Sequence, residues 1–418
     1  MIARTLAAAV LALAISMPAR AAEPTIYGAL FDEVWKTVDE NFYDPTFGGR
    51  DWRAIGDRYR ARLPTVMDDA AFATLANAML GELQVSHLYL SPPAGNAVKG
   101  GVGIGAVVEE RDAEQVVVEV VPLSDAQRQG LRVGDRVLNP AELSGPLGAS
   151  SDLQIRGCDG RRRTLRVRHE RALWPPQHPA FEWRQVTIRP GVSLGYIRID
   201  RFDDGAAALA DQAMAELKDT QGLVIDVRRN TGGNLSGLRL TSYFSGASRP
   251  AVALLGKPYL QALGRRVTAA DIAALPATRG AYTDEAIFAA LQAGKGAAVY
   301  YSDDLGAARY AGKVVVVIGE ETSSAGEGFA AITRDLAGAT LVGRPTAGYL
   351  LSSDRFTLSG GWRLTAPVDG VWAADGRDYG DKAVAPDALV ARTAADVCRA
   401  DDPDLAKAVD ILTAGLKP

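Results

Sequence analysis

The chain has 418 residues, of which 46 are lysine or arginine and 50 are aspartate or glutamate, giving a formal net charge of −4. This length exceeds a usual single domain, so we expect two or three compact units with sizeable cores. The mildly acidic balance makes nucleic acid a poor partner. The chain has two cysteines, Cys158 and Cys398, and an oxidising compartment would allow them to pair if their geometry permits it.

Residues 1–21 have the pattern of a secretory signal. Arg4 precedes an apolar run from Leu6 to Ile15, and Ala19-Arg20-Ala21 fits a small-residue cleavage site. The alternative, a membrane anchor, needs about 20 uninterrupted apolar residues, and Pro18 arrives too early for that. We therefore expect an exported protein of the bacterial periplasm, with no integral membrane segment after cleavage. Loss of two arginines would move the formal net charge from −4 to −6.

A small helical unit is expected within residues 22–95. Apolar residues recur there three or four positions apart, as at Val34 and Val38 and again at Phe72, Leu75 and Met79. The glycine- and proline-containing stretch between Tyr43 and Gly49 marks a turn between the helices.

Short β-rich segments follow in residues 98–172. The strongest are Val102 to Val108, Val116 to Val121 and Leu165 to Arg168, with a helix-like Ser124 to Gln127 between them. Arginines at positions 161, 162, 163, 166 and 168 alternate in part with Leu165 and Val167, as on the solvated face of a strand. His169 ends this strand and is expected at the surface.

The order of three pieces in this segment resembles a PDZ domain. They are a glycine loop at Gly101 to Gly105, the pair Ala126 and Gly130-Leu131, and the run Arg132 to Leu138. The resemblance implies a PDZ-like β domain that binds an extended peptide, often a chain's C-terminus, as an added strand. The amides around Gly103, Ile104 and Gly105 would then hold the terminal carboxylate.

An α/β unit is expected over residues 180–418, after the proline-rich linker 174–179 that contains His178. Gly195 to Ile199, Leu223 to Val227 and Val314 to Ile318 are continuous enough to be strands buried on both faces. Helical segments at Ala206 to Lys218 and Asn234 to Phe244 separate them. Residues 246–308, with helix-like stretches at 269–274 and 284–293, suggest an insertion that could cap a site.

Two glycine-containing junctions in this unit could carry chemistry. Asn230-Thr231-Gly232-Gly233 follows a strand and leads into a helix, so its glycines can turn backbone amides toward one point. Thr322-Ser323-Ser324-Ala325-Gly326 stands in the same way at a strand's end and a helix's start, where amides favour negative charge. The simpler alternatives are an ordinary turn and a helix-capping serine.

Taken together, the pieces resemble the C-terminal processing (tail-specific) serine peptidases, with a helical part, a PDZ domain and an α/β core in this order. The likeness extends through Gly343 to Gly348 and Ala385-Pro386-Asp387. It implies a core with a crotonase/ClpP-like spiral of strands and helices. Matching the motifs places the nucleophile on Ser324 and the oxyanion donors on the amides of Gly232 and Ala325.

The general base departs from the common pattern of that family. Many members use a lysine about 25 residues after the serine, but this chain has Tyr349 there, and a tyrosine with a pKa near 10 is a poor base. Ser86-His87 resembles instead the Ser-His pair of the tricorn-like branch, where the histidine activates the nucleophile and the serine links it to an acidic residue. The alternative for a lone histidine is a structural role.

The acidic member is less clearly marked by the resemblance. In the tricorn-like branch a glutamate lies shortly before a Gly-Val-x-Pro-Asp stretch, and direct matching places Gly380 at that position. Asp381 is one residue further along and is the first choice, Asp378 is the second, and either could be a surface carboxylate. Lys382 is a weaker alternative as a displaced lysine base.

The resemblance therefore implies an exported serine endopeptidase acting on proteins or peptides without a metal or organic cofactor. Its oligomeric state stays open. Loss of the family lysine leaves two other functions to consider: a catalytically inactive binder of peptides or hydrophobic ligands on the same scaffold, and a purely structural periplasmic scaffold. Retention of Ser86, His87 and Ser324 argues against the inactive binder, and the structural scaffold predicts no chemical reactivity at all.

Overall fold

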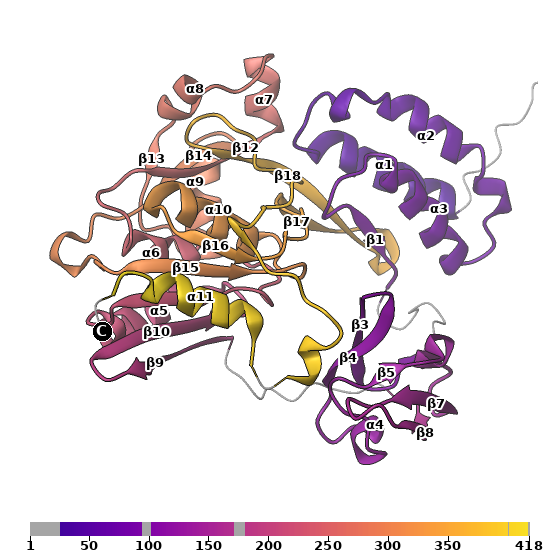
Figure 1. Ribbon diagram of the computed structural model, residues 1–418. Coiled ribbons are helices and arrows are strands. Elements are labelled where there is room, and N and C mark those ends of the chain that lie inside the picture. Colours follow the sequence, from indigo (N-terminus) through magenta and orange to yellow (C-terminus); the bar gives the residue numbers. More distant parts are fainter. Residues whose placement is uncertain (1–25, 94–101, 171–179, 400, 417–418) are drawn as a thin grey trace, which may run out of the picture.

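The structure, a computed structural model, describes residues 26–93, 102–170, 180–399 and 401–416 (Figure 1). The expected signal at 1–21, the linker with His178 and Gly101 of the glycine loop lie outside these ranges. In the described part of the chain, no helix is both long enough and apolar enough to traverse a bilayer.

Three helices open the described chain: α1 Ile26–Asn41, α2 Trp52–Arg60 and α3 Asp69–Gly81. The apolar spacing predicts α1 and α3, whereas it does not single out α2. The Asp51 and Asp68 side chains cap α2 and α3 by accepting amide hydrogens of Ala54 and Ala71. The buried faces of the helices, including Phe31 and Phe72, share one apolar cluster with Trp362 and Leu364 of strand β18. These helices are therefore packed onto the α/β core rather than set apart from it.

Residues 102–170, here called the small β unit, form a five-stranded antiparallel sheet in the order β3-β4-β5-β7-β8. The elements are β2 Val102–Gly103, β3 Ala106–Arg111, β4 Glu114–Val120, α4 Asp125–Arg128, β5 Arg136–Val137, β6 Ser144–Gly145, β7 Ser150–Arg156 and β8 Arg162–Arg168. β8 alternates exposed and buried residues as predicted. The unit has its own apolar core, centred on Leu153 and Ile155.

His169 differs from the sequence expectation, because it is buried rather than exposed. Its Nε2 lies 2.9 Å from the Ser151 hydroxyl and its Nδ1 lies 3.2 Å from the carbonyl oxygen of Val102. Both ring nitrogens are thus occupied by groups of the small β unit, which gives this histidine a structural place in the unit.

The first core sheet has the order β19-β16-β15-β11-β10-β9. Its strands are β9 Phe181–Arg189, β10 Val192–Ile199, β11 Gly222–Asp226, β15 Lys313–Ile318, β16 Thr340–Gly343 and β19 Ala388–Leu389. β10, β11, β15, β16 and β19 run parallel, and every residue of β11 is buried. The three predicted strands are confirmed at these places, although Tyr196 and Arg198 of β10 are only half-buried.

Helices cover both faces of this sheet. α5 Ala206–Leu217, α6 Gly237–Ser242 and α10 Ala325–Ala337 pack on one face, against side chains such as Ile225 and Val316. α11 Pro403–Thr413 packs on the other, against Val224 and Val315. Because successive residues of a strand point to opposite faces, one apolar run supplies both layers. The mixed α/β architecture is as expected.

The second core sheet has the order β1-β18-β12-β14-β13. β1 and β12 pair with opposite ends of the same edge of β18, and β17 pairs with its other edge. Its strands are β1 Tyr89–Ser91, β12 Pro250–Gly256, β13 Ala277–Thr278, β14 Ala297–Tyr301, β17 Ser352–Thr357 and β18 Arg363–Ala373. Residues 246–308, for which the sequence suggests a capping insertion, supply β12, β13 and β14 together with α7 Lys257–Leu263, α8 Ala269–Ala273 and α9 Asp284–Ala293. They are integral to this sheet, and α9 borders the cleft described below.

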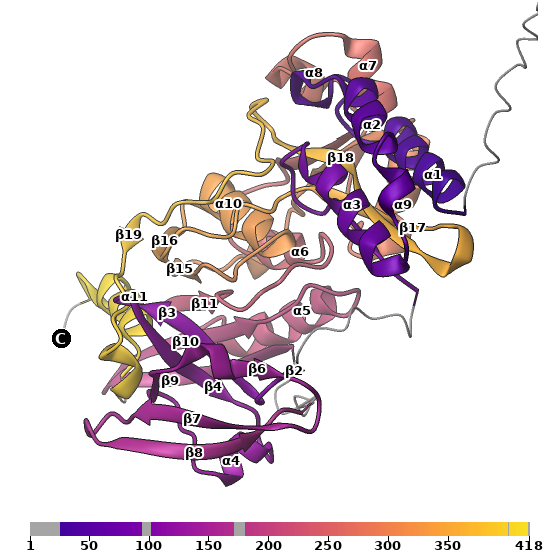
Figure 2. The same cartoon turned by 90° about the vertical axis from the view of Figure 1, so that its right-hand side faces the viewer.

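The small β unit is attached to the C-terminal segment that precedes α11 (Figure 2). A disulfide joins Cys158 to Cys398. Nearby, the Ala394 amide donates to Asp112 Oδ2 at 2.8 Å, and Arg136 donates to the Ala394 carbonyl at 3.1 Å. The pairing of the two cysteines, which the sequence leaves open, is therefore present.

Candidate active site

Ser324 lies between β15 and α10, at the N-terminal end of the helix. Its backbone has φ 52° and ψ −122°, a positive φ that non-glycine residues rarely adopt and that is frequent at functional sites. Its amide donates to Glu327 Oε2 at 2.9 Å. The side chain stands beside the open amides of the first helical turn, where negative charge is favoured.

Glu327 fixes this turn and is a residue that the sequence reasoning missed. It is fully buried and also accepts hydrogen bonds from the Thr346 hydroxyl at 2.5 Å, the Gly348 amide at 2.6 Å and the Tyr349 amide at 2.7 Å. Burial raises the pKa of its carboxyl, and these donors act in the opposite direction. An acidic residue three positions after a candidate helix cap is the signal that could have revealed it.

The glycine turn lies directly against Ser324, although the open amide differs from the expected one. The Gly232 amide donates to Asn230 Oδ1 at 2.9 Å, so it is already occupied. The Gly233 amide donates no hydrogen bond within the described part of the chain, and Gly233 lines the same cavities as Ser324. Ala325 is the first residue of α10, so its amide has no partner in the helix. The geometry thus favours Gly233 and Ala325, rather than Gly232 and Ala325, as a pair of donors.

The Ser86-His87 pair meets Asp381. The Ser86 hydroxyl donates to Asp381 Oδ1 at 2.5 Å, and the Ser86 amide donates to Oδ2 of the same carboxylate at 2.9 Å. The Ser86 oxygen lies 2.9 Å from His87 Nδ1. Since that hydroxyl gives its hydrogen to Asp381, the oxygen accepts from Nδ1–H, which leaves Nε2 as the proton acceptor.

Asp378 and Lys382, the alternatives to Asp381 that the sequence offers, bond to groups other than Ser86 and His87. Asp378 accepts from the Gly380 amide at 2.9 Å. Lys382 is well exposed, and its Nζ lies 3.2 Å from the carbonyl oxygen of Asp378 and 3.5 Å from its carboxylate. Of the carboxylates that the sequence suggests, Asp381 is the one in contact with Ser86.

His87 and Ser324 border the same cleft. No hydrogen bond joins them among the residues that the structure describes, as is common before substrate binds. Burial lowers the pKa of His87 below its ordinary value, while the Asp381 carboxylate acts in the opposite direction. Ser324, His87 and Asp381 all have positive φ values, of 52°, 57° and 45°. Three strained non-glycine residues gathered at one place are typical of a functional site.

An apolar pocket opens beside Ser324 and Ala325. Its walls include Leu238 of α6, Leu254 of β12 and Phe329 of α10, and its volume is about 220 Å³. The polar group of Thr241 in this wall is already bonded to the Thr333 hydroxyl at 2.8 Å. Cavities of about 150 Å³ with apolar walls hold a benzene molecule. The pocket therefore suits an apolar side chain next to the nucleophile.

Tyr349 and residues 103–105, which the sequence analysis also considered, do not line the cleft that Ser324 and His87 share. Tyr349, which stands where many relatives of the resembled family have lysine, is 54% exposed. Gly103, Ile104 and Gly105 lie in the small β unit, where the Ile104 side chain is part of that unit's own core. The Tyr349 backbone amide, by contrast, bonds to Glu327, which also accepts from the Ser324 amide.

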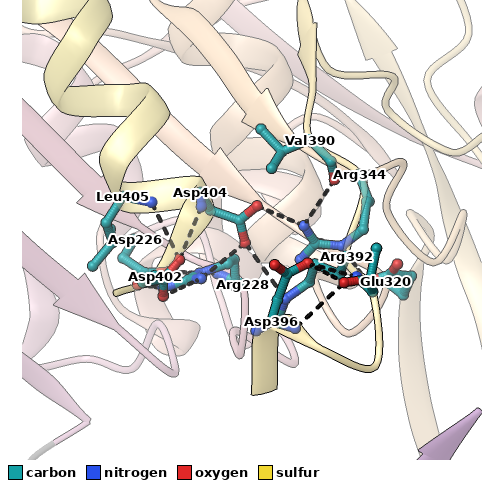
Figure 3. Close-up of polar contacts among 12 residues, drawn as sticks. Asp226, Arg228, Glu320, Arg344, Val390, Arg392, Asp396, Asp402, Asp404 and Leu405 are labelled. Atoms are coloured by element: carbon teal, nitrogen blue, oxygen red, sulfur yellow. Dashed lines mark hydrogen bonds and ion pairs between the residues drawn. The ribbon is translucent and has the colours of Figure 1, made fainter. Parts of the chain in front are cut away.

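A charged network joins residues that follow β11 and β15 to the start of α11 (Figure 3). Arg228, which lies between the end of β11 and the glycine turn at 230–233, donates to Asp402 at 2.7 Å and to Asp404 at 2.9 Å. Arg344 donates to Asp404 at 2.7 Å and to Glu320, which begins the nucleophile turn, at 2.9 Å. The start of α11 therefore ties both turns together through the buried Asp404 carboxylate, which also lies 3.9 Å from Arg392.

Comparison with known proteins relates most of this chain to peptidases. Residues 193–390 match the model of Peptidase family S41, and residues 27–81 match that of the Tricorn protease C1 domain. The chain is 27% identical over 253 residues to the chloroplastic C-terminal processing peptidase of Tetradesmus obliquus, covering 53% of this chain and 54% of that protein. It is 26% identical over 428 residues to tricorn protease homolog 1 of Streptomyces coelicolor, covering 93% of this chain and 35% of that protein.

In both comparisons the chain spans roughly half or less of its relative's length. Among solved structures, the photosystem II D1 C-terminal processing protease superposes with a TM-score of 0.51 at 21% identity, covering 88% of this chain and 93% of that one. At this identity the likeness is one of fold.

Proposed function

From the premise that residues 193–390 form a domain of peptidase family S41, we propose that the protein is a serine peptidase with Ser324 as nucleophile and His87 as general base. The observation that carries the proposal is the hydrogen-bonded series Asp381–Ser86–His87, which ends at the cleft that Ser324 borders. A series of this kind orients an imidazole and stabilises its protonated form.

The steps follow from the positions of the groups. The Ser324 hydroxyl attacks a peptide carbonyl, and Nε2 of His87 takes its proton. The amides of Gly233 and Ala325 stabilise the oxyanion, because neither is used elsewhere among the described residues. His87 then returns the proton to the leaving amine, and water hydrolyses the acyl enzyme by the same route.

The finer parts of the proposal concern substrate and place. The apolar pocket beside Ser324 favours an apolar residue on the acyl side of the scissile bond, because most of its lining is apolar and a charged side chain would lose hydration against it. The PDZ resemblance suggests that the small β unit captures an extended chain end, and residues 1–21 suggest export to the periplasm. Substrates would then be exported proteins or peptides.

A fluorophosphonate probe tests the chemistry directly. The wild type should be labelled, Ser324→Ala should not be, and His87→Ala should react at least about 100-fold more slowly. Lys382→Ala is the matched control and should react like the wild type. Full reactivity of His87→Ala would rule out the histidine mechanism, and a folded wild-type protein that is never labelled would contradict the peptidase proposal itself.

A further inference from the structure

β17 is an edge strand of the second core sheet. It pairs with β18 along residues 352–357, whereas β1 and β12 occupy the opposite edge of β18. In the described ranges no other strand pairs with β17. Such an edge presents unpaired amide and carbonyl groups that can accept another extended chain. Exposed charges at Asp354 and Arg355 are of the kind that discourages indiscriminate pairing.

This free edge follows the cleft that holds Ser324. Consecutive residues Leu350 to Ser353 line the apolar pocket, and residues 352–356 line the cleft that Ser324 and His87 share. Residues 201–205, together with Thr231, Gly233 and Asn234, line the same cleft. An extended chain lying along β17 would therefore pass the nucleophile with one side chain over the apolar pocket.

The local contacts of β17 agree with an edge that awaits a partner. The Arg355 amide donates to the carboxylate of the neighbouring Asp354 at 2.6 Å, a contact within the strand itself. The Ser352 side chain turns inward and donates to Asp369 at 3.0 Å, which holds the start of the strand against β18. One edge of β17 is thus held by β18, and the Arg355 amide is bonded to the neighbouring Asp354 side chain.

We propose that the free edge of β17 binds the backbone of the substrate as an added strand and so places the scissile bond at Ser324. This rests on the proposed peptidase function and adds the element that holds the substrate. Six residues in a strand extend roughly 20 Å, so the edge would hold about six substrate residues. Backbone pairing is indifferent to side chains, so selectivity would fall mainly on the residue in the apolar pocket.

Backbone methylation of the substrate tests this pairing without altering the enzyme. A peptide of about ten residues with leucine at the expected acyl position is made in versions that carry one N-methyl group at each successive amide. Binding of each version to full-length Ser324→Ala is measured by fluorescence anisotropy. Strand pairing uses every second amide, so affinity should fall about 5- to 10-fold at alternate positions and change little between them.

The neighbouring positions of each peptide serve as the matched control, because they differ only in which edge of the strand carries the methylated amide. Affinity losses without alternation, or no binding of the unmodified peptide, would overturn the β17 proposal. Cleavage of the unmodified peptide by the wild type is measured separately. Ser324-dependent cleavage with no alternation in affinity would support the peptidase and contradict only the added strand at β17. Alternating affinity without cleavage would support the added strand and contradict the peptidase.

Discussion

Asp381 holds Ser86 by two hydrogen bonds, one to its hydroxyl at 2.5 Å and one to its backbone amide at 2.9 Å. One carboxylate therefore fixes both the position of the Ser86 backbone and the direction of its hydroxyl. The adjacent His87, whose Nδ1 lies 2.9 Å from that hydroxyl oxygen, inherits its orientation from this arrangement.

Replacing Asp381 should uncouple this series. Asp381→Asn keeps the shape of the side chain but removes the charge that favours protonated His87, so we expect kcat/KM to fall roughly 10²- to 10⁴-fold. Asp378→Asn is the matched control and should retain most of the activity. Peptide hydrolysis measures both, and equal losses in the two variants would contradict the assignment of Asp381.

The pH dependence should report the environment of His87. Burial lowers the pKa of its imidazole below the ordinary value of about 6.5, so the midpoint of the acidic limb of kcat/KM should lie below that value. Asp381 raises that pKa, so the acidic limb of Asp381→Asn should move to still lower pH. A limb that moves to higher pH in this variant would show that another group titrates.

Asp404 should be important for stability. It is fully buried and shared by Arg228, Arg344 and Arg392, so Asp404→Ala leaves three cations without this partner and should cost about 3 to 5 kcal/mol of unfolding free energy. Asp401→Ala removes the partner of Arg399 in an exposed ion pair and should cost less than about 1 kcal/mol. Urea unfolding compares the two variants, and similar costs would argue against the shared carboxylate as an anchor.

Asp369 should make stability depend on pH. Burial raises the pKa of this carboxyl to about 6, so the folded state binds its proton more tightly than the unfolded state does. Its contribution is present at low pH and is lost as the pH rises through about 6. Asp369→Asn should therefore be more stable than the wild type at pH 8 by about 2 to 3 kcal/mol, with a small difference near pH 4. A stability gap that is the same at both pH values would refute this.

The disulfide should be needed for full stability. Cys158 and Cys398 are both exposed and link the small β unit to the C-terminal segment across 240 residues. Reduction should lower the unfolding free energy by up to about 4 kcal/mol, because it releases a long closed loop in the unfolded chain. The double variant Cys158→Ser/Cys398→Ser should start at the lower value and not respond to reductant. A reductant-sensitive double variant would show that reduction acts elsewhere.

The sequence predicted local elements better than their assembly. The strands around Leu223 and Val314 and the helices at 26–41 and 284–293 follow from apolar runs and spacing that the structure retains. The second sheet could not be predicted this way, because β1, β12 and β18 come from distant parts of the chain and meet only through tertiary packing.

At the candidate site, motif matching brought together residues that the structure places side by side, including Ser86 and Asp381. It could not tell which of two adjacent glycine amides is open, because that depends on the Asn230 side chain and not on residue type. It also missed Glu327, whose partners come from residues 346–349. The burial of His169 could not be predicted from the sequence either, because its partners Ser151 and Val102 reach it only in the folded chain.

The contact between Ser86 and Asp381 spans 295 residues, and this has a consequence during biosynthesis. At 5 to 20 residues per second, a ribosome needs roughly 15 to 60 s to make the stretch between them. Throughout that interval the growing chain carries Ser86 and His87 without their carboxylate, and for most of it without Ser324 as well. The proposed peptidase would thus remain silent while it is being made, with no separate inhibitory segment required.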